Sequence, residues 1–515
     1  MHTNRMPSVM NHRFSEVPHA DINRSSFDRS HGYKTTFDAG FLVPIFVDEA
    51  LPGDSFNLNM DGFARMATPI NPLMDNLYLE TFFFAVPNRL IWDNWQKFNG
   101  EQDNPGDTTD YLIPQVTAPA GTGWTNASIG DYFGIPTGVA DLPTNALHFR
   151  ALNLIYNEWF RDENLQDSLD VPTDDGPDDP SLYNLFRRGK RHDYFTSCLP
   201  WPQKGDAVDL PLGSEAPVMT ATNITGTGEG FLKMANASTF NISTTSGSFA
   251  TNDVIQLNSD LTDATAATIN DLREAFQVQK LYERDARGGT RYTEIIRAHF
   301  GVTSPDARLQ RPEYLGGGRS YVNIMPVAQT SSTDATTPQG NLSAVGTAQL
   351  ENHGFTKSFT EHCVIIGFAC VRADLTYQQG LNRMWSRRNR WDFYWPALAH
   401  LGEQAVESKE IYADGSADDD LVFGYQERFA EYRYKPSLIT GKFRSSDPQS
   451  LDPWHLSQDF STRPLLNATF IEENPPLDRV IALPSEPHFI FDSYYRLHCA
   501  RPMPTYSVPG LIDHF

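Results

Sequence analysis

The sequence predicts a mainly β protein, a sandwich of antiparallel sheets in which long inserted loops and a few helices carry much of the mass. Three observations lead to this prediction. Strand-like segments lie near both ends of the chain, the 515 residues include 35 glycines and 35 prolines, and long helical patterns are rare. With 40% hydrophobic and 12% aromatic residues, the chain can bury a sizeable core.

The first predicted strands follow residue 34 and cover 35–47 and 55–67, with a turn between them. Residues 77–86 are apolar on nearly both faces and stop before Pro87, a pattern typical of a strand buried on both sides. Further strands are predicted over residues 357–375, 428–435, 437–444 and 488–499. Because such strands flank long excursions, we expect one domain over 35–515 with large insertions.

Two helices are predicted, over 145–165 and 270–287, the second ended by Gly288 and Gly289. Thr144 or Asn145 can cap the first helix. Its apolar stripe is Leu147, Ala151, Leu154, Ile155 and Trp159, and its polar stripe is Arg150, Asn153, Asn157, Arg161 and Asn164. The acidic segment after it, with Asp174, Asp175, Asp178 and Asp179, is interpreted as a solvated loop, and the glycine-rich segment 316–320 as a flexible turn.

Residues 1–34 are predicted to form an extended N-terminal arm. The segment has no periodicity, is interrupted by Pro7 and Pro18, and is locally basic in an acidic chain. Two interpretations stay open: a disordered terminus, or an arm that lies along a partner subunit or nucleic acid.

The segment 213–268 differs from the rest of the chain, since it is almost all Ser, Thr, Ala, Gly and Asn. Phe231, Phe240 and Phe249 recur in it every nine residues. Such a tract cannot bury enough apolar surface to form its own core, so its short hairpins must lean on neighbours. We interpret it as a surface protrusion whose core these phenylalanines would form, with a tolerated loop insertion as the alternative.

The net charge of −23 means that the chain as a whole is repelled by nucleic acid phosphates. Nucleic acid binding would therefore need local basic patches or a basic helper protein. None of the four cysteines forms a C-x-x-C pair, which fits a reducing compartment. The longest apolar run, 363–371, is far too short to span a membrane, so no membrane insertion is expected.

The sequence contains no motif that carries known catalytic chemistry. It has no nucleophile elbow, phosphate-binding loop, zinc-protease motif or kinase set. We therefore predict no enzyme activity, no catalytic residue, no metal site and no cofactor.

Two basic clusters are the candidate functional residues. The first comprises Arg187, Arg188, Lys190 and Arg191, and the second Arg387, Arg388 and Arg390, both interleaved with aromatic residues. Arginines can meet phosphates while rings stack on bases, which suits single-stranded nucleic acid. The alternatives are an internal ion-pair network or a contact between subunits, because arginine and tryptophan also favour protein interfaces.

Several long segments resemble the major capsid protein of microviruses, in particular its gokushovirus branch. They are KRHDYFTS at 190–197, LPWPQKG at 199–205, ERDARGGTR at 283–291, SPDARLQRPEY at 304–314, RADLTYQQGLN at 372–382 and the ending RPMPTYSVPGLIDHF at 501–515. PINPLMDNLY at 69–78 also fits. The matching segments run from about residue 34 to the C-terminus, whereas segment 213–268 falls where the family varies.

This resemblance implies an eight-stranded viral jelly roll and a bacteriophage virion with a T=1 icosahedral shell of about sixty copies. It implies a circular single-stranded DNA genome inside, a small basic DNA-binding protein, an internal scaffolding protein and assembly in the bacterial host cytoplasm. In the family a long insertion forms a protrusion at the three-fold axes, where it is thought to contact a host cell-surface receptor. Segment 213–268 falls at that place in the chain.

The competing class is a β-sandwich carbohydrate-binding protein or glycoside hydrolase. Acidic charge, aromatic residues and sandwich strands would also suit sugar binding. The two classes differ in assembly, because a lectin or glycosidase should be a monomer or small oligomer.

Overall fold

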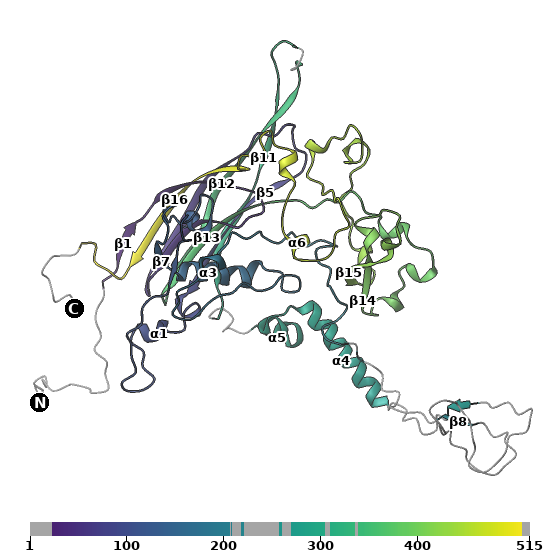
Figure 1. Cartoon of the computed structure of the whole chain (residues 1–515), viewed down its shortest axis with the longest axis horizontal. Coiled ribbons are helices and arrows are strands. Elements are labelled where there is room, and N and C mark those ends of the chain that lie inside the picture. The colour runs from purple at the N-terminus through teal and green to yellow at the C-terminus, as the bar shows by residue number, and fades with distance from the viewer. Residues whose placement is uncertain are drawn as a thin grey trace, which may run out of the picture. The chain divides into compact units, whose positions relative to one another are not determined.

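The computed structural model describes residues 23–206, 208, 218–220, 257–259, 269–303, 310–334 and 338–506. The chain divides into two compact units (Figure 1). Unit 1 comprises Met1–Pro200, Thr303–Ala399 and Ala405–Phe515, and unit 2 comprises Trp201–Val302 and His400–Gln404. Each unit is described by itself below.

Unit 1 is built on two antiparallel sheets whose strands come from both ends of the chain (Figure 1). The larger, six-stranded sheet has the order β1-β16-β4-β12-β11, with β2 also paired to β16. Its strands are β1 (Ser25–Asp28), β2 (His31–Phe37), β4 (Ser55–Met66), β11 (Asn323–Ala328), β12 (Leu342–Ser358) and β16 (Phe489–Arg501). The four-stranded sheet has the order β10-β5-β13-β3, from β3 (Val43–Ala50), β5 (Leu77–Pro87), β10 (Glu313–Tyr321) and β13 (Cys363–Ala373).

The pairs in these sheets are nested along the sequence. Strand β2 pairs with β16, β3 with β13, β4 with β12 and β5 with β10, all antiparallel. Successive strands from the N-terminal part therefore alternate between the sheets, and each pairs with a partner met in reverse order. The prediction of a mainly β sandwich is confirmed. The finer prediction of an eight-stranded jelly roll stays a prediction.

The two sheets differ in how they are covered, and the sequence pattern of their strands shows it. Strand β16 alternates buried and exposed residues, as expected when one face packs on the core and the other meets solvent. All residues of β13 are buried, and all but Phe82 in β5 are buried. The two central strands of the four-stranded sheet are therefore covered on both faces, as the apolar run at 77–86 predicted.

One hydrophobic core lies between the sheets and a second lies on the other face of the four-stranded sheet. The first core includes Phe56, Leu58, Phe83, Phe489 and Phe491. In the second core, Phe84, Val364, Ile366 and Phe368 of the sheet pack with Leu147, Phe149, Leu152 and Ile155 of helix α3 (Leu147–Ile155). Each large side chain buried in this way contributes about 1.5–3 kcal/mol.

Helix α3 confirms the predicted helix but is shorter, and it continues as a π-helical turn over Tyr156–Phe160. Two residues of the predicted polar stripe, Arg150 and Asn153, are fully buried. Arg150 Nε and Nη2 donate to the Asp178 carboxylate at 2.8 and 2.5 Å. The prediction of a solvated acidic loop is therefore wrong for Asp178. Helix α3 is covered on several sides, so the buried charge of Arg150 requires a counter-charge, which Asp178 of the loop supplies.

Several segments fold differently from the sequence prediction, among them the strand predicted over 35–47, which divides into β2 and β3. The run predicted over 357–375 divides into the end of β12 and β13, and the glycine-rich segment at 316–320 lies inside β10 rather than in a flexible turn. The strands predicted over 428–435 and 437–444 are instead 3₁₀ turns at Ala430–Tyr432 and Gly441–Phe443. Left-handed backbone at Phe429 (φ 63°) and Gly441 (φ 65°) interrupts any extended run there.

The remaining short elements of the fold lie in the long connections. They are α1 (Trp95–Phe98), β6 (Gln115–Thr117), α2 (Ile129–Tyr132), β7 (Pro143–Asn145), β14 (Glu403–Glu407), β15 (Val422–Glu427) and α6 (Ala468–Ile471). Strand β6 pairs with β7, and β14 with β15.

Unit 2 contains the second predicted helix, α4 (Ile269–Gly288), which ends at the predicted glycines and is followed by α5 (Tyr292–Phe300). His299 of α5 contacts Asp285 of α4 at 2.6 Å, which fastens the two helices together. A short hairpin pairs β8 (Val218–Thr220) with β9 (Leu257–Ser259). Phe231, Phe240 and Phe249 lie outside the described residues.

Candidate functional site

The first basic cluster lies on a segment that is hydrogen-bonded to two other parts of the chain. The Arg188 N–H donates to Gly40 O at 2.8 Å, and the Lys190 N–H donates to Ile471 O at 2.7 Å. Glu473 N–H in turn donates to Arg188 O at 2.7 Å. These backbone bonds hold the four cations beside the four-stranded sheet.

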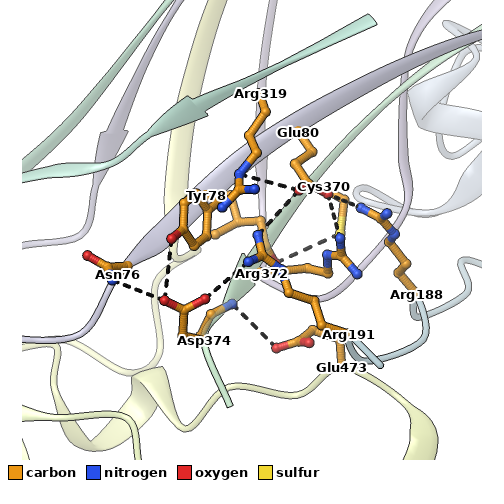
Figure 2. A network of polar contacts seen from close by, with 12 residues as sticks. Asn76, Tyr78, Glu80, Arg188, Arg191, Arg319, Cys370, Arg372, Asp374 and Glu473 are labelled. Carbon is orange, nitrogen blue, oxygen red and sulfur yellow. Dashed lines mark hydrogen bonds and ion pairs between the residues drawn. The ribbon is translucent and has the colours of Figure 1, made fainter. Parts of the chain in front are cut away.

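Four arginines converge on one carboxylate, that of Glu80 in β5 (Figure 2). Arg188 and Arg372 both pair with its Oε2, the latter at 2.8 Å. Arg191 and Arg319 approach its Oε1 at 3.4 and 3.7 Å. The Glu80 side chain is only 9% exposed, so this carboxylate is the counter-charge at the centre of a largely buried network.

A second carboxylate, Asp374, extends this network toward solvent (Figure 2). Arg191 pairs with Asp374 Oδ1 at 3.1 Å. Asn76 Nδ2 and the Tyr78 hydroxyl donate to Asp374 Oδ2 at 3.0 and 3.3 Å. The network thus joins β5 and β13 to the segment that carries the first basic cluster.

The electrostatics of Glu80 follow from this geometry. Burial acts to raise the pKa of Glu80, but the positive charges of Arg188 and Arg372 outweigh it and hold the pKa below its usual value. The carboxylate therefore stays ionised in the folded chain.

The other two cations of the first cluster, Lys190 and Arg187, also contact side chains of the same chain. Lys190 Nζ donates to Gln458 Oε1 at 3.1 Å and lies 4.4 Å from the centre of the Phe470 ring. Burial lowers the pKa of Lys190 to about 8, although Glu473 opposes the shift. The Arg187 guanidinium lies 4.1 Å from the centre of the Phe41 ring. Within the chain, this first cluster therefore takes part in an internal ion-pair network. That it also contacts DNA or another subunit stays a prediction.

The second basic cluster lies at the surface of unit 1. Arg387 pairs with Glu431 at 3.4 Å and lies 4.1 Å from the Tyr432 ring centre. Arg390 lies over the rings of Trp395 and Trp391, at 4.6 and 5.1 Å. The Arg388 side chain is exposed, and its backbone N–H donates to Asp392. In the second cluster Arg388 and Arg390 are therefore exposed, whereas Arg387, like the first cluster, is largely buried.

Sequence reasoning missed Glu80, Arg319, Arg372 and Glu473 as members of the network. A signal existed for two of them. Glu80 is the only charged residue in the apolar run 77–86, and Arg372 closes the apolar run of β13. A lone charge in a strand buried on both faces requires an opposite charge nearby, although the sequence does not say which residue supplies it.

A buried histidine, His353, lies between the two sheets. Its Nδ1 is 2.8 Å from Thr81 Oγ1 and its Nε2 is 3.3 Å from Ser320 Oγ. A side chain at Gly318 would place its Cβ 2.5 Å from the His353 ring, so glycine is required there. Burial lowers the pKa of His353 below its usual value.

We expect the substitution His353→Gln to weaken the pH dependence of stability in mild acid. Because the pKa of His353 is lower when folded than when unfolded, the unfolded chain takes up the proton first. Stability is therefore lost as the pH falls from the ordinary histidine value toward the lowered one. Glutamine can replace the hydrogen bonds without this titration. Urea unfolding between pH 7 and pH 5 measures the slope, and His498→Gln, at an exposed site of β16, is the matched control. Equal slopes in wild type and His353→Gln would contradict the expectation.

No catalytic constellation emerges from the residues that the structure describes. Within them, no group of three or more His, Cys, Asp or Glu side chains is placed to hold a metal ion. Among the same residues, no helix is both long and apolar enough to cross a membrane. The four cysteines are free and buried, and burial raises the pKa of Cys370 to about 12.

Comparisons with known proteins give the class of the chain. A family model described as "Capsid protein (F protein)" matches residues 15–511. The capsid protein VP1 of Bdellovibrio phage phiMH2K is 52% identical over 526 residues, which cover 98% of each chain. The capsid protein VP1 of Chlamydia phage 1 is 47% identical and that of Spiroplasma virus 4 is 37% identical, each over at least 97% of both chains.

The match over almost the whole length to phage capsid proteins defines the chain as a structural protein. The chain belongs to the F-protein family of phage capsid proteins. The predicted resemblance to microvirus major capsid proteins is confirmed, and so is the prediction of a virion protein rather than an enzyme.

Proposed function

We propose that the chain assembles into a T=1 icosahedral shell of about sixty copies that encloses a circular single-stranded DNA genome. The observation that carries this proposal is the match over almost the whole length to capsid proteins named from three microviruses. These matches cover 97–98% of this chain, and so include the strands of both sheets.

The net charge of the chain supports a role for a second, basic protein that binds the DNA inside the shell. A chain with a net charge of −23 gives little attraction for DNA, so a small basic DNA-binding protein would neutralise the packaged phosphates. An internal scaffolding protein would guide the copies together. Buried, unpaired cysteines suit assembly in the reducing cytoplasm of a bacterial host.

The protrusion is the proposed site of host attachment. Segment 213–268 is rich in Ser, Thr and Asn, whose side chains offer hydrogen bonds to a glycan or another polar receptor. Three copies meeting at an axis could pool Phe231, Phe240 and Phe249 into a shared core that one copy cannot form.

The test is electron microscopy and sedimentation of the chain produced together with the other proteins of its virus. About sixty copies of a 57.9 kDa chain should give particles of about 3.5 MDa, containing single-stranded circular DNA. A stable monomer or small oligomer would instead favour a carbohydrate-binding protein or glycoside hydrolase, a class that the family membership already disfavours.

A further inference from the structure

We propose that an aromatic surface on unit 1 binds an acidic surface of a second copy of this chain in the assembled shell. The inference rests on the proposed function and specifies one contact of it. The aromatic surface comprises Met384, Trp385, Trp391, Phe393, Tyr394, Trp395 and Tyr432.

The exposure of these side chains is the first observation. Trp385 is 71% exposed, Trp391 59%, Phe393 51% and Tyr394 49%. Apolar patches that are contiguous and large are rare on soluble monomers, because they are costly to hydrate. Tryptophan and tyrosine are also the residues that contribute most to protein interfaces.

Ring contacts join five of these side chains into two groups. Tyr394 and Tyr432 lie 6.2 Å apart, and the Arg387 guanidinium lies over both Tyr432 and Phe393. The Arg390 guanidinium bridges the rings of Trp391 and Trp395 in the same way. Two arginines thus act as spacers that hold aromatic rings beside one another.

The backbone under the aromatic surface is fixed before any partner arrives. Asp392 Oδ2 accepts the N–H groups of both Arg388 and Asn389 at 2.7 Å. Arg383 Nη1 donates to Glu410 Oε1 at 2.7 Å, and Asn382 caps the turn that carries Trp385. A surface ordered in advance loses less conformational entropy on binding.

The charges favour a protein partner over single-stranded DNA. A groove for DNA follows the backbone with several free cations. Here Arg387 is paired with Glu431, Arg390 lies on two indole rings, and Asp392 offsets one further charge. The exposed Arg388 and the ring-stacked Arg390 then remain to meet phosphates, which is too little for a DNA track.

The charges also favour a second copy of this chain as the protein partner of the aromatic surface. Copies that each carry −23 repel one another wherever acidic surfaces meet. The aromatic surface keeps the positive charges of Arg388 and Arg390, and unit 1 also exposes an acidic segment with Asp167, Asp170 and Asp179. A contact between two different surfaces of identical chains can propagate around a closed shell.

The test removes two exposed indoles by Trp385→Ala and Trp391→Ala together. Co-production with the partner proteins should give at least about tenfold fewer particles in a sedimentation gradient, because interface tryptophans dominate binding energy. The melting temperature of the unassembled chain should not change, since both rings are exposed. Leu112→Ala with Leu465→Ala, which removes two exposed side chains outside the aromatic surface, is the matched control and should leave the yield unchanged.

A second variant, Arg388→Glu, tests the charge of the partner surface. It should also lower particle yield, because it places a negative charge against an acidic surface. Normal yields with both variants would overturn the inference, and normal yield with reduced DNA content would show that the surface serves the genome instead. If the wild-type chain itself forms no particles, the proposed shell function fails, which is a distinct result.

Discussion

The substitution Glu80→Gln should lower the free energy of unfolding by about 3–5 kcal/mol, as expected when one partner of a buried ion pair is removed. Glu80 is the shared counter-charge of Arg188, Arg191, Arg319 and Arg372. Glutamine keeps the shape of the side chain but leaves these guanidinium groups facing one another without compensation. Urea titration of the unassembled chain at pH 7 measures the change.

An exposed ion pair is the matched control for this substitution. Lys34 and Asp492 lie 2.8 Å apart with side chains 76% and 55% exposed. Asp492→Asn should therefore change stability by less than about 1 kcal/mol. If Glu80→Gln costs no more than this control, the network does not stabilise the fold.

The pH dependence of the Glu80 effect has a definite sign. The folded-state pKa of Glu80 lies below its usual value, so the stabilisation is fully present above the usual carboxyl range. It is lost as the pH falls through the lowered pKa. The difference between wild type and Glu80→Gln should accordingly shrink in acid, and a constant difference would point to packing rather than charge.

Deletion of segment 213–268 should permit particle assembly but abolish attachment to host cells. The two sheets and both hydrophobic cores lie in unit 1, which does not include this segment. Replacing the segment by a short Gly-Ser linker keeps the chain connected. Sedimentation of particles and adsorption to host cells are the two measurements.

The two measurements separate three roles for this segment. Loss of assembly would make it a structural element, and full infectivity without it would make it a tolerated insertion. A variant with Phe231, Phe240 and Phe249 all replaced by serine keeps the length and tests whether these rings are needed. We expect it to assemble but to attach poorly, because the pooled core of the protrusion would be lost.

The parts of the fold that could be predicted are those whose pattern is local. Residues 77–86 and 363–371 are apolar on both faces, and both became central strands of the four-stranded sheet. The strands predicted at 428–435 and 437–444 were wrong. Their aromatic and β-branched residues favour strands, but the backbone forms left-handed turns at Phe429 and Gly441, which local propensity does not indicate. Local propensity predicts a secondary-structure element correctly only when the tertiary contacts of that segment favour the same conformation.

The candidate site was harder to predict because its partners are remote in the sequence. Arg188 and Glu80 are 108 residues apart, and Arg372 and Glu80 are 292 apart. The cations of the first cluster were visible in the sequence because they lie close together. Only the structure shows that they are largely buried and that Arg188 and Arg191 pair with carboxylates of the same chain. In the second cluster the interleaved tryptophans were visible, whereas their exposure could only come from the structure.

Strand β16 completes the six-stranded sheet from a late part of the sequence. This strand, Phe489–Arg501, pairs with β4 on one side and with β1 and β2 on the other. While the ribosome is still making earlier residues, β4 keeps an unpaired edge that other chains could join. A chain released early lacks the strand that closes this edge. Without β16, β1 and β2 also lose their pairing partner, so this one strand holds the six-stranded sheet together.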